Sequence, residues 1–565
     1  MSSIEKTKTI TRPPSRSKKF LQNSVFAFIL QILTIVSGFI IPRFKLVYFG
    51  SEINGILASI LQFIAVIAIV EAGLGAAALF SLYKPLAEDD KNALSARMST
   101  IEKSYKNTAA FFIIAAVALA FIYPFIVESG TLSFWEIAIL VAVLAVPRAL
   151  EFLFTSKYVV LLTASQNAKI NSIVMSISIV LRTAIFVLLA ILGIHVAIIY
   201  TITILVSIFN VGFLHFYCKK KYPHIDYSKP KDSSLLHKRK SAMGGQIASI
   251  VYSTALVVIA TIMLPLEEIS VFNIFSLVTI GVPAVLFIFS NSVAPTFGDI
   301  IAKNETDLLK KNFELFDQAF SIISSILFMC IVILVVPFIM LYTHNIYDAD
   351  YYRRLLAILM TAVVAIGSTS IAPDIIMASA GFYKQQFLTT LAMAIFMVMF
   401  GTLFAFIWGI EGLVIALLLT YIIRLFCFVI YIKKKFPMLS LFNMIRNRLI
   451  VLAMFAGGII FMLFFQIEIS NYGFWILYAL IVFASTIAIA LVLNIIFNPK
   501  KTKRLISKTL NFIKRKRENA VLNESAEQQE EQELKCQGQL EENQIDNARE
   551  NKNETVYKKA YTKKN

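Results

Sequence analysis

Three arginines lie within long apolar stretches of this 565-residue chain, namely Arg148, Arg182 and Arg424. A charged side chain in apolar surroundings is costly, and it usually faces the interior of a helix bundle or a water-filled cavity. The guanidinium fork binds two phosphate oxygens at once. Together with Arg43 and Lys45, which follow the first apolar stretch, these cations predict a binding path for an anionic, phosphate-bearing substrate.

Each arginine also has a structural alternative. Arg148 has Glu151 three positions later, so the two side chains can neutralise one another on one helix. Arg424 lies about two turns from the end of its stretch, from where its side chain can reach polar surroundings. Arg182 has no acidic residue at i±3 or i±4, and we expect it to line the central cavity of the N-terminal lobe with Arg148 nearby. The alternative for Arg182 is an internal ion pair with Glu71.

Two acidic residues in apolar stretches, Glu71 and Asp374, are predicted sites for a coupling proton or sodium ion. Glu71 is close to Gly73 and Gly75, and small residues permit close helix packing. The alternative for Glu71 is therefore a tightly packed helix in which an arginine neutralises it. Asp374 follows Pro373, where a kink would free backbone carbonyl groups to bind a cation.

The sequence has no pattern typical of catalysis. The five histidines are dispersed, the four cysteines form no CxxC pair, and neither a P-loop nor a dinucleotide fingerprint is present. We therefore expect no catalytic residues, no metal site and no cofactor, and we predict that the protein is not an enzyme.

The composition predicts a membrane protein. Apolar residues make up 58% of the chain and charged residues 16%, with a mean hydropathy of +0.73. Soluble domains are typically about 45–50% apolar and about 25% charged. These values exclude a soluble enzyme, a disordered protein and a disulfide scaffold, and they suggest lipid rather than nucleic acid as a partner. The first apolar stretch, 20–41, is long enough to cross a bilayer and is predicted to be an uncleaved span.

Apolar windows predict an all-α polytopic membrane protein with fourteen spans. The predicted spans are 20–42, 53–82, 108–127, 135–162, 170–192, 195–217, 243–264, 269–296, 316–341, 354–380, 386–408, 411–432, 449–466 and 474–497. Kinks are expected at Pro147 and Pro373. Basic residues cluster in the connectors after even-numbered spans, whereas the other side carries only Arg43, Lys45, Arg353 and Arg354. The positive-inside rule then places both termini in the cytoplasm and leaves short outer loops.

The first six spans and the next six are predicted to be two copies of one unit. Residues 87–94 resemble 302–309 at an offset of 215, and Lys169 corresponds to Lys384 at the same offset. Six spans per copy keep both copies in one orientation, related by a pseudo-two-fold axis along the membrane normal. The predicted organisation is a basic cytoplasmic N-terminus (1–19), an N-terminal six-helix lobe (20–217), a basic linker (218–242), a C-terminal six-helix lobe (243–432), a connector with two extra helices (433–497) and a cytoplasmic tail, basic and then disordered (498–565).

Several segments resemble a known transporter family. Residues 48–55 (YFGSEING), 71–75 (EAGLG) and 82–87 (LYKPLA) resemble the bacterial polysaccharide repeat-unit flippases, the Wzx-type branch of the multidrug/oligosaccharidyl-lipid/polysaccharide exporter superfamily. Residues 295–298 (PTFG) and 348–352 (DADYY) are similar to further segments of that family. The resemblance spans about 20–497 and carries over no site residue.

The resemblance implies a flippase of the bacterial cytoplasmic membrane that serves O-antigen or capsule synthesis. Its substrate would be undecaprenyl-pyrophosphate-linked oligosaccharide, moved from the cytoplasmic to the outer leaflet by alternating access, with glycosyltransferases and a polymerase as possible partners. Two alternatives stay open: a cation-coupled multidrug exporter of the same superfamily, and a membrane polymerase or acyltransferase. The short outer loops and the repeat argue against the enzymes. We expect the two extra helices to pack outside one lobe and to border an opening for the lipid tail.

Overall fold

The structure is a computed structural model that describes residues 16–228, 235–291, 293–465, 467, 469, 471–499, 502, 503 and 507. The chain forms two compact units, residues 1–491 and 492–565. Every contact discussed below lies within the first unit. Residues 1–15 and almost all of the tail after 499 lie outside the described residues, so the predictions made for those segments remain predictions.

All secondary structure in the described part of the chain is helical, which confirms the predicted fold class. The elements are α1 (Arg16–Ile67), η1 (Ala68–Glu71), α2 (Leu74–Ala87), α3 (Lys91–Ile126), α4 (Phe134–Leu150), η2 (Glu151–Thr155), α5 (Ser156–Ala164), α6 (Ala168–Ile191), α7 (Val196–Lys221), α8 (Leu235–Met263), α9 (Leu266–Asn291), α10 (Ala294–Ala302), α11 (Thr306–Tyr342), α12 (Arg354–Thr369), α13 (Ile371–Ser379), α14 (Tyr383–Lys435), α15 (Leu441–Phe464) and α16 (Tyr472–Phe497).

The predicted spans coincide with these helices. Among the described residues, 11 helices are long and apolar enough to cross a membrane. Two of them, Leu21–Glu71 and Tyr383–Lys435, each hold two predicted spans, because the chain reverses at Gly50 and Gly409. Both glycines have a positive φ, a backbone conformation that residues with a Cβ atom rarely adopt. α9 matches the remaining predicted span, so the chain is a multi-pass membrane protein.

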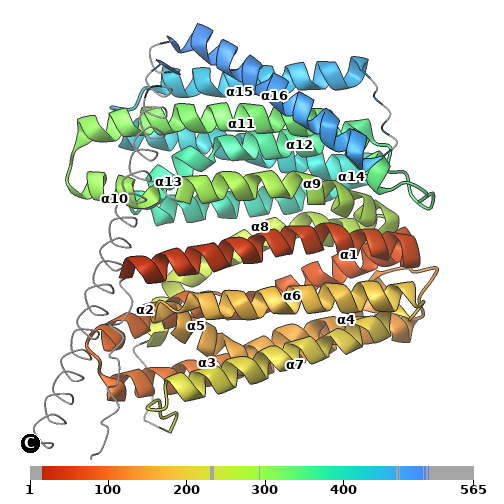
Figure 1. Cartoon of the computed structure of the whole chain (residues 1–565), viewed down its shortest axis with the longest axis vertical. Coiled ribbons are helices and arrows are strands. Elements are labelled where there is room, and N and C mark those ends of the chain that lie inside the picture. Colours follow the sequence, from red (N-terminus) through yellow and green to blue (C-terminus); the bar gives the residue numbers. More distant parts are fainter. Residues whose placement is uncertain are drawn as a thin grey trace, which may run out of the picture. The chain divides into compact units, whose positions relative to one another are not determined.

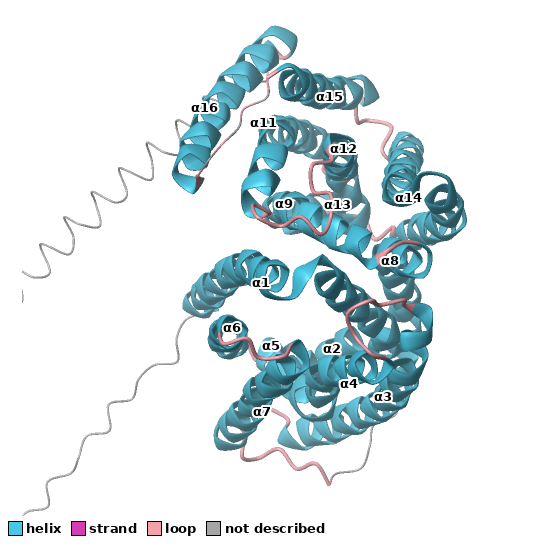
Figure 2. Cartoon of the chain, turned by 90° about the vertical axis from the view of Figure 1, so that its right-hand side faces the viewer, coloured by secondary structure: helices cyan, strands magenta, loops and turns pink. Residues whose placement is uncertain are grey.

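The helices of the first unit form two groups (Figure 1). We call α1–α7 the N-terminal lobe and α8–α14 the C-terminal lobe; they meet where α1 packs against α8 and α9 (Figure 2). α8 begins at Leu235, inside the predicted linker 218–242, because the helix extends beyond its apolar stretch. We call the end of the bundle that carries the basic connectors the basic end. The other end, with loops 127–133, 192–195 and 343–353, is the opposite end.

Backbone geometry recurs at the offset found in the sequence. α3 begins at Lys91 and α11 at Thr306, which is 215 positions later. Three left-handed residues of the N-terminal lobe each have a left-handed counterpart 215 or 216 positions later: Asp89 and Asn304, Gln166 and Gly381, and Gly193 and Gly409. Turns that need positive φ are specified locally by the sequence, so their recurrence agrees with two copies of one unit.

Both lobes contain helices that are broken within the bundle. In the N-terminal lobe, the 3₁₀ turn η1 and the left-handed Gly73 separate α1 from α2, and the π-turn η2 separates α4 from α5. In the C-terminal lobe, Ser370 separates α12 from α13. Such breaks leave backbone groups without helical partners, and at membrane depth these groups need other donors and acceptors.

The two extra helices lie outside the C-terminal lobe. α15 packs along α11 and also contacts α12. In α16, the Trp475 ring lies 5.1 Å from the ring of Phe338, and the Thr486 hydroxyl is 3.1 Å from the Cys330 thiol, both on α11. This is the placement expected for helices added to the edge of one lobe.

Candidate functional site: a cavity between the lobes

A cavity of about 880 Å³ lies between the two lobes. Its wall is formed by α1 and α6 of the N-terminal lobe and by α8, α9, α12, α13 and α14 of the C-terminal lobe. Most of the lining surface is apolar, and hydroxyl and amide side chains are interspersed in it, among them Thr34, Ser37, Gln62, Asn273, Ser276 and Ser370. These neutral groups suit a ligand that is itself rich in hydroxyl groups.

The charged residues in the cavity wall are Lys45, Asp374 and Arg424. Arg424 Nη2 lies 2.7 Å from Asp374 Oδ2, and Gln386 donates to Asp374 Oδ1 at 2.7 Å. The Arg424 guanidinium also lies 5.2 Å from the ring centre of Phe428. Asp374 is therefore held by two donors, and the charge of Arg424 is balanced on one side.

Lys45 differs from Arg424 because it has no acidic partner in the described part of the chain. Its side chain lines the cavity, yet the residue is only 7% exposed. The ammonium lies 5.9 Å from the ring centre of Tyr200 on α7, and no ion pair with a described carboxylate is present. The ammonium faces the cavity with no carboxylate of the described residues beside it, so this position is suited to an anion that enters the cavity.

Hydrogen bonds between the lobes close the opposite end of the cavity. Asp348 accepts from both the backbone N–H and the hydroxyl of Ser51, each at 2.6 Å. The Ser51 hydroxyl is also 2.7 Å from the Tyr351 hydroxyl, which lies 3.0 Å from Ser270. Burial raises the pKa of Tyr351 to about 12, so its phenol remains a neutral donor. Because Ser51 begins the second half of α1, Asp348 caps a helix of the other lobe.

Close packing continues this closure further into the bundle. The Ser59 hydroxyl lies 2.6 Å from the Thr261 hydroxyl, joining α1 to α8. A Cβ atom at Gly55 would overlap the carbonyl group of Leu266, so a glycine is required for α1 to approach α9 this closely. The two lobes are therefore in direct contact from Ser51 to Ser59 along α1.

Arg43 takes part in the same closure. Its guanidinium donates to the carbonyl oxygens of Tyr342 at 2.5 Å and His344 at 3.1 Å, at the end of α11. The Tyr342 hydroxyl donates in turn to the carbonyl of Phe39 at 2.6 Å. Arg43 is not among the residues that line the cavity, so its contacts here are between the lobes.

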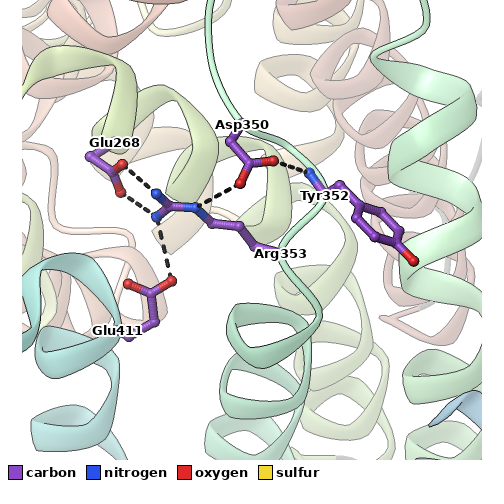
Figure 3. A network of polar contacts seen from close by, with 5 residues as sticks. All are labelled: Glu268, Asp350, Tyr352, Arg353 and Glu411. Carbon is purple, nitrogen blue, oxygen red and sulfur yellow. Dashed lines mark hydrogen bonds and ion pairs between the residues drawn. The ribbon is translucent and has the colours of Figure 1, made fainter.

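The loop that carries Asp348 and Tyr351 is anchored by Arg353 (Figure 3). The Arg353 guanidinium donates to both carboxylate oxygens of Glu268, at 2.5 and 2.7 Å, and lies 3.4 Å from Glu411. These contacts join the start of α12 to α9 and α14 within the C-terminal lobe. The closing loop thus rests on a fixed base, while its contacts with Ser51 cross to the other lobe.

Two other predicted site residues, Arg148 and Glu71, lie together in the N-terminal lobe. Arg148 lies 2.7 Å from Glu151 and 3.7 Å from Glu71, with the ring centre of Phe152 at 4.7 Å. The pairing with Glu151 is the alternative that the i+3 spacing predicted. Glu71 ends the 3₁₀ turn η1, and its carboxylate lies over Gly75, where a Cβ would come within 3.1 Å.

Arg182 contacts its own lobe, and its predicted place at the central cavity of the N-terminal lobe stays a prediction. Its Nη2 donates to the Ser207 hydroxyl on α7 at 2.8 Å, while its buried Nε has no partner. Arg182 and Arg148 are not among the lining residues of the cavity between the lobes. The ion pair between Arg182 and Glu71 is not present either, because Arg148 occupies that place. The helical faces of α4 and α6 that carry these arginines pack within their own lobe.

The structure thus places three of the seven predicted residues, Lys45, Asp374 and Arg424, in one cavity. The neutral polar wall was not singled out in the sequence. A signal for it exists in α1, where Thr34, Ser37 and Lys45 lie on one helical face. Hydroxyl groups in apolar helices often bond their own backbone, so this spacing alone does not separate lining from packing positions.

Removing Arg148 is expected to destabilise the protein. Arg148→Met takes away the cation between two carboxylates and should lower stability by roughly 1–3 kcal/mol. Adding Glu71→Gln to that variant should recover part of the loss, because one of the repelling charges is gone. The melting temperatures of the purified single and double variants measure this. A double variant that melts no higher than Arg148→Met would show that Glu71 is not coupled to Arg148.

Comparisons with known proteins bear on the fold. No protein-family model matches the sequence, and no curated protein matches it significantly. Solved structures do match: an inward-facing MATE-family multidrug resistance transporter of the MOP superfamily has a TM-score of 0.59 at 11% identity, covering 77% of this chain and 98% of that one. The lipid II flippase MurJ, in an inward closed conformation, has a TM-score of 0.60 at 13% identity, covering 85% of this chain and 99% of that one.

A MOP superfamily transporter from Pyrococcus furiosus matches with a TM-score of 0.54 at 12% identity, covering 77% of this chain and 96% of that one. The chain has the fold of these membrane transporters. The proteins in these three structures are transporters and a flippase rather than enzymes. At 11–13% identity the likeness is one of fold, so the substrate has to be argued from the residues of this chain.

Proposed function

We propose that the protein is a flippase for polyprenyl-pyrophosphate-linked oligosaccharide, such as the repeat units of O-antigen or capsule. The observation that carries the proposal is Lys45, a cation in the cavity wall that pairs with no carboxylate among the described residues. Anionic substrate provides the missing counterion. The hydroxyl and amide groups around the cavity offer donors and acceptors to a sugar, and a volume of about 880 Å³ lies within the usual range for ligand sites.

The cations of the cavity wall lie on different helices and receive the headgroup in different ways. Arg424 is already bound to Asp374, so an arriving phosphate competes with that carboxylate. Lys45 needs no such exchange. The polyprenyl chain stays in lipid, because each CH₂ exposed to water costs about 0.8 kcal/mol. The headgroup alone crosses the cavity while the tail passes outside the bundle.

We propose transport from the basic end to the opposite end, and the closed opposite end is consistent with substrate entry from the basic end. With Ser51 bound to Asp348, the substrate enters from the basic end, which the positive-inside rule assigns to the cytoplasm. Release requires these contacts to break. Both termini are then cytoplasmic, and the protein resides in the bacterial cytoplasmic membrane. Glu71 and Asp374 remain the proposed sites for a coupling ion. Glu71 contacts Arg148 and Asp374 contacts Arg424, so an ion that binds either carboxylate competes with that arginine.

The competing proposal is a cation-coupled multidrug exporter, which the match to multidrug transporters favours. Cationic drugs need an accessible acid in the cavity. Asp374 is the acidic residue among the lining residues, and Arg424 and Gln386 already bind it. The charged lining residues therefore carry a net positive charge, which suits an anion better than a cationic drug.

Reconstitution separates the two proposals. Vesicles containing the purified full-length protein, with labelled polyprenyl-pyrophosphate disaccharide in the outer leaflet, should move the sugar to a compartment protected from periodate oxidation. Protein-free vesicles give the background rate. The same vesicles should not accumulate a cationic dye under a proton or sodium gradient. Accumulation of the dye together with background movement of the glycolipid would reject the flippase in favour of the exporter.

A further inference from the structure

The break between α12 and α13, in the cavity wall, leaves the Thr369 carbonyl without a donor from its own helix. α12 ends at Thr369 and α13 begins at Ile371, and both Ser370 and Asp374 line the cavity. In a continuous helix the carbonyl of Thr369 would accept from the residue four positions later. That residue is Pro373, which has no N–H group. The break therefore leaves the Thr369 carbonyl without a helical donor inside the bundle.

The missing donor comes from the first extra helix. Arg448 of α15 donates through Nη2 to the Thr369 carbonyl at 3.2 Å. Its Nη1 lies 2.5 Å from Asp317 Oδ1 of α11, and Asn447 donates to the other carboxylate oxygen at 2.8 Å. Arg448 is 9% exposed and Asp317 2%. The sequence had suggested that Pro373 frees a carbonyl for a cation, and in the structure that cation is a guanidinium.

At the equivalent break in the N-terminal lobe, the backbone carbonyl receives its hydrogen bonds from a different source. Thr155 lies 215 positions before Ser370 and ends the π-turn η2. The carbonyl of Glu151 in this turn accepts from the hydroxyls of Thr155 at 3.1 Å and Ser156 at 3.0 Å. These donors are local, and no helix outside the lobe is needed. The C-terminal lobe instead draws its donor from α15.

We propose that Arg448, held in place by Asp317, is a positioning residue through which α15 fixes the bend between α12 and α13. The bend in turn sets the position of Asp374, and through it that of Arg424, in the cavity wall. The extra helix thus shapes the cavity although it does not line it. The consequence for transport rests on the proposed function, whereas the consequence for the bend does not.

The test uses a thiol reporter at the bend. In the full chain with its four native cysteines replaced, Ser368→Cys places one thiol in the cavity wall next to Thr369; the Ser368 hydroxyl is buried and has no partner, so the change removes no hydrogen bond. The pair Asp317→Leu and Arg448→Met then removes the clamp without leaving an unpaired charge. The control is Glu102→Leu with Lys157→Met, which removes a 2.7 Å ion pair in the N-terminal lobe whose lysine is as buried as Arg448 and whose carboxylate is more exposed than Asp317.

Loss of the clamp should raise the rate at which a water-soluble maleimide labels the reporter by about tenfold, the effect of one charge-assisted hydrogen bond. Glycolipid translocation should fall by a similar factor, and the control pair should leave the labelling rate unchanged. An unchanged labelling rate in a folded clamp variant overturns the proposal. If the clamp variant is labelled faster but translocates glycolipid at the full rate, the bend does not affect transport, and that part of the proposal is overturned.

Two further results keep the test decisive. If the double variant does not fold, Arg448→Lys keeps the charge next to Asp317 but loses the planar fork. It should still label faster than the parent, and an equal rate overturns the proposal. If the parent protein moves no glycolipid, the proposed function fails, while the labelling rates still decide whether α15 fixes the bend.

Discussion

A disulfide bond between the two lobes is expected to stop transport completely. Ser59→Cys with Thr261→Cys, in the chain without native cysteines, places two thiols where hydroxyl oxygens now lie 2.6 Å apart on α1 and α8. Both residues are buried, and the separation is compatible with an S–S bond of about 2.05 Å. Oxidation should cross-link the protein and reduce glycolipid translocation to the protein-free rate, because the opposite end can no longer open. A reductant should restore it.

A second cross-link is the control for non-specific inactivation of the protein by disulfide formation. Thr486→Cys, with the native Cys330 retained, joins α16 to α11 across a distance of 3.1 Å on one side of the bundle. This disulfide should form equally well and leave translocation intact, since it does not join the lobes. Full transport by the protein cross-linked between positions 59 and 261 would mean that the lobes do not separate there. Alternating access through this closure would then be excluded.

The sequence predicts the closure only in part. The offset of 215 residues and the left-handed turns that follow it can be found without a structure, because turns with positive φ depend on local residue types. The reversal at Gly50 is of this kind. The contact between Ser51 and Asp348 is not, since it joins residues 297 positions apart in two lobes whose relative placement no local pattern encodes.

Local sequence patterns also predict some arginine contacts and not others. The pairing of Arg148 with Glu151 follows from helical spacing, and the structure contains it. The direction of Arg182 depends on how α6 is rotated against α1 and α7, and the polar side of a membrane helix can face either a cavity or a neighbouring helix. Pro373 predicts a freed carbonyl, yet its donor lies on a helix 79 positions after Thr369.

Lys45 is expected to be the residue whose loss most reduces transport without weakening the fold. Lys45→Met removes the cation proposed to bind the pyrophosphate and should lower glycolipid translocation by about two orders of magnitude, the effect of losing one partner of a buried charge pair. Lys45→Arg should keep part of the activity, because the charge remains. Since the ammonium pairs with no carboxylate among the described residues, its replacement by methionine should also raise the melting temperature.

Arg424→Met provides the contrast that makes this prediction specific. Its removal leaves Asp374 with Gln386 but without its ion pair, so both translocation and melting temperature should fall. A residue that serves only the fold would behave like Arg424 in the thermal measurement. If Lys45→Met melts below the parent, its ammonium has a structural partner. If Lys45→Met melts higher and still translocates at the parental rate, the cavity does not use this cation, and the anionic substrate loses its main support.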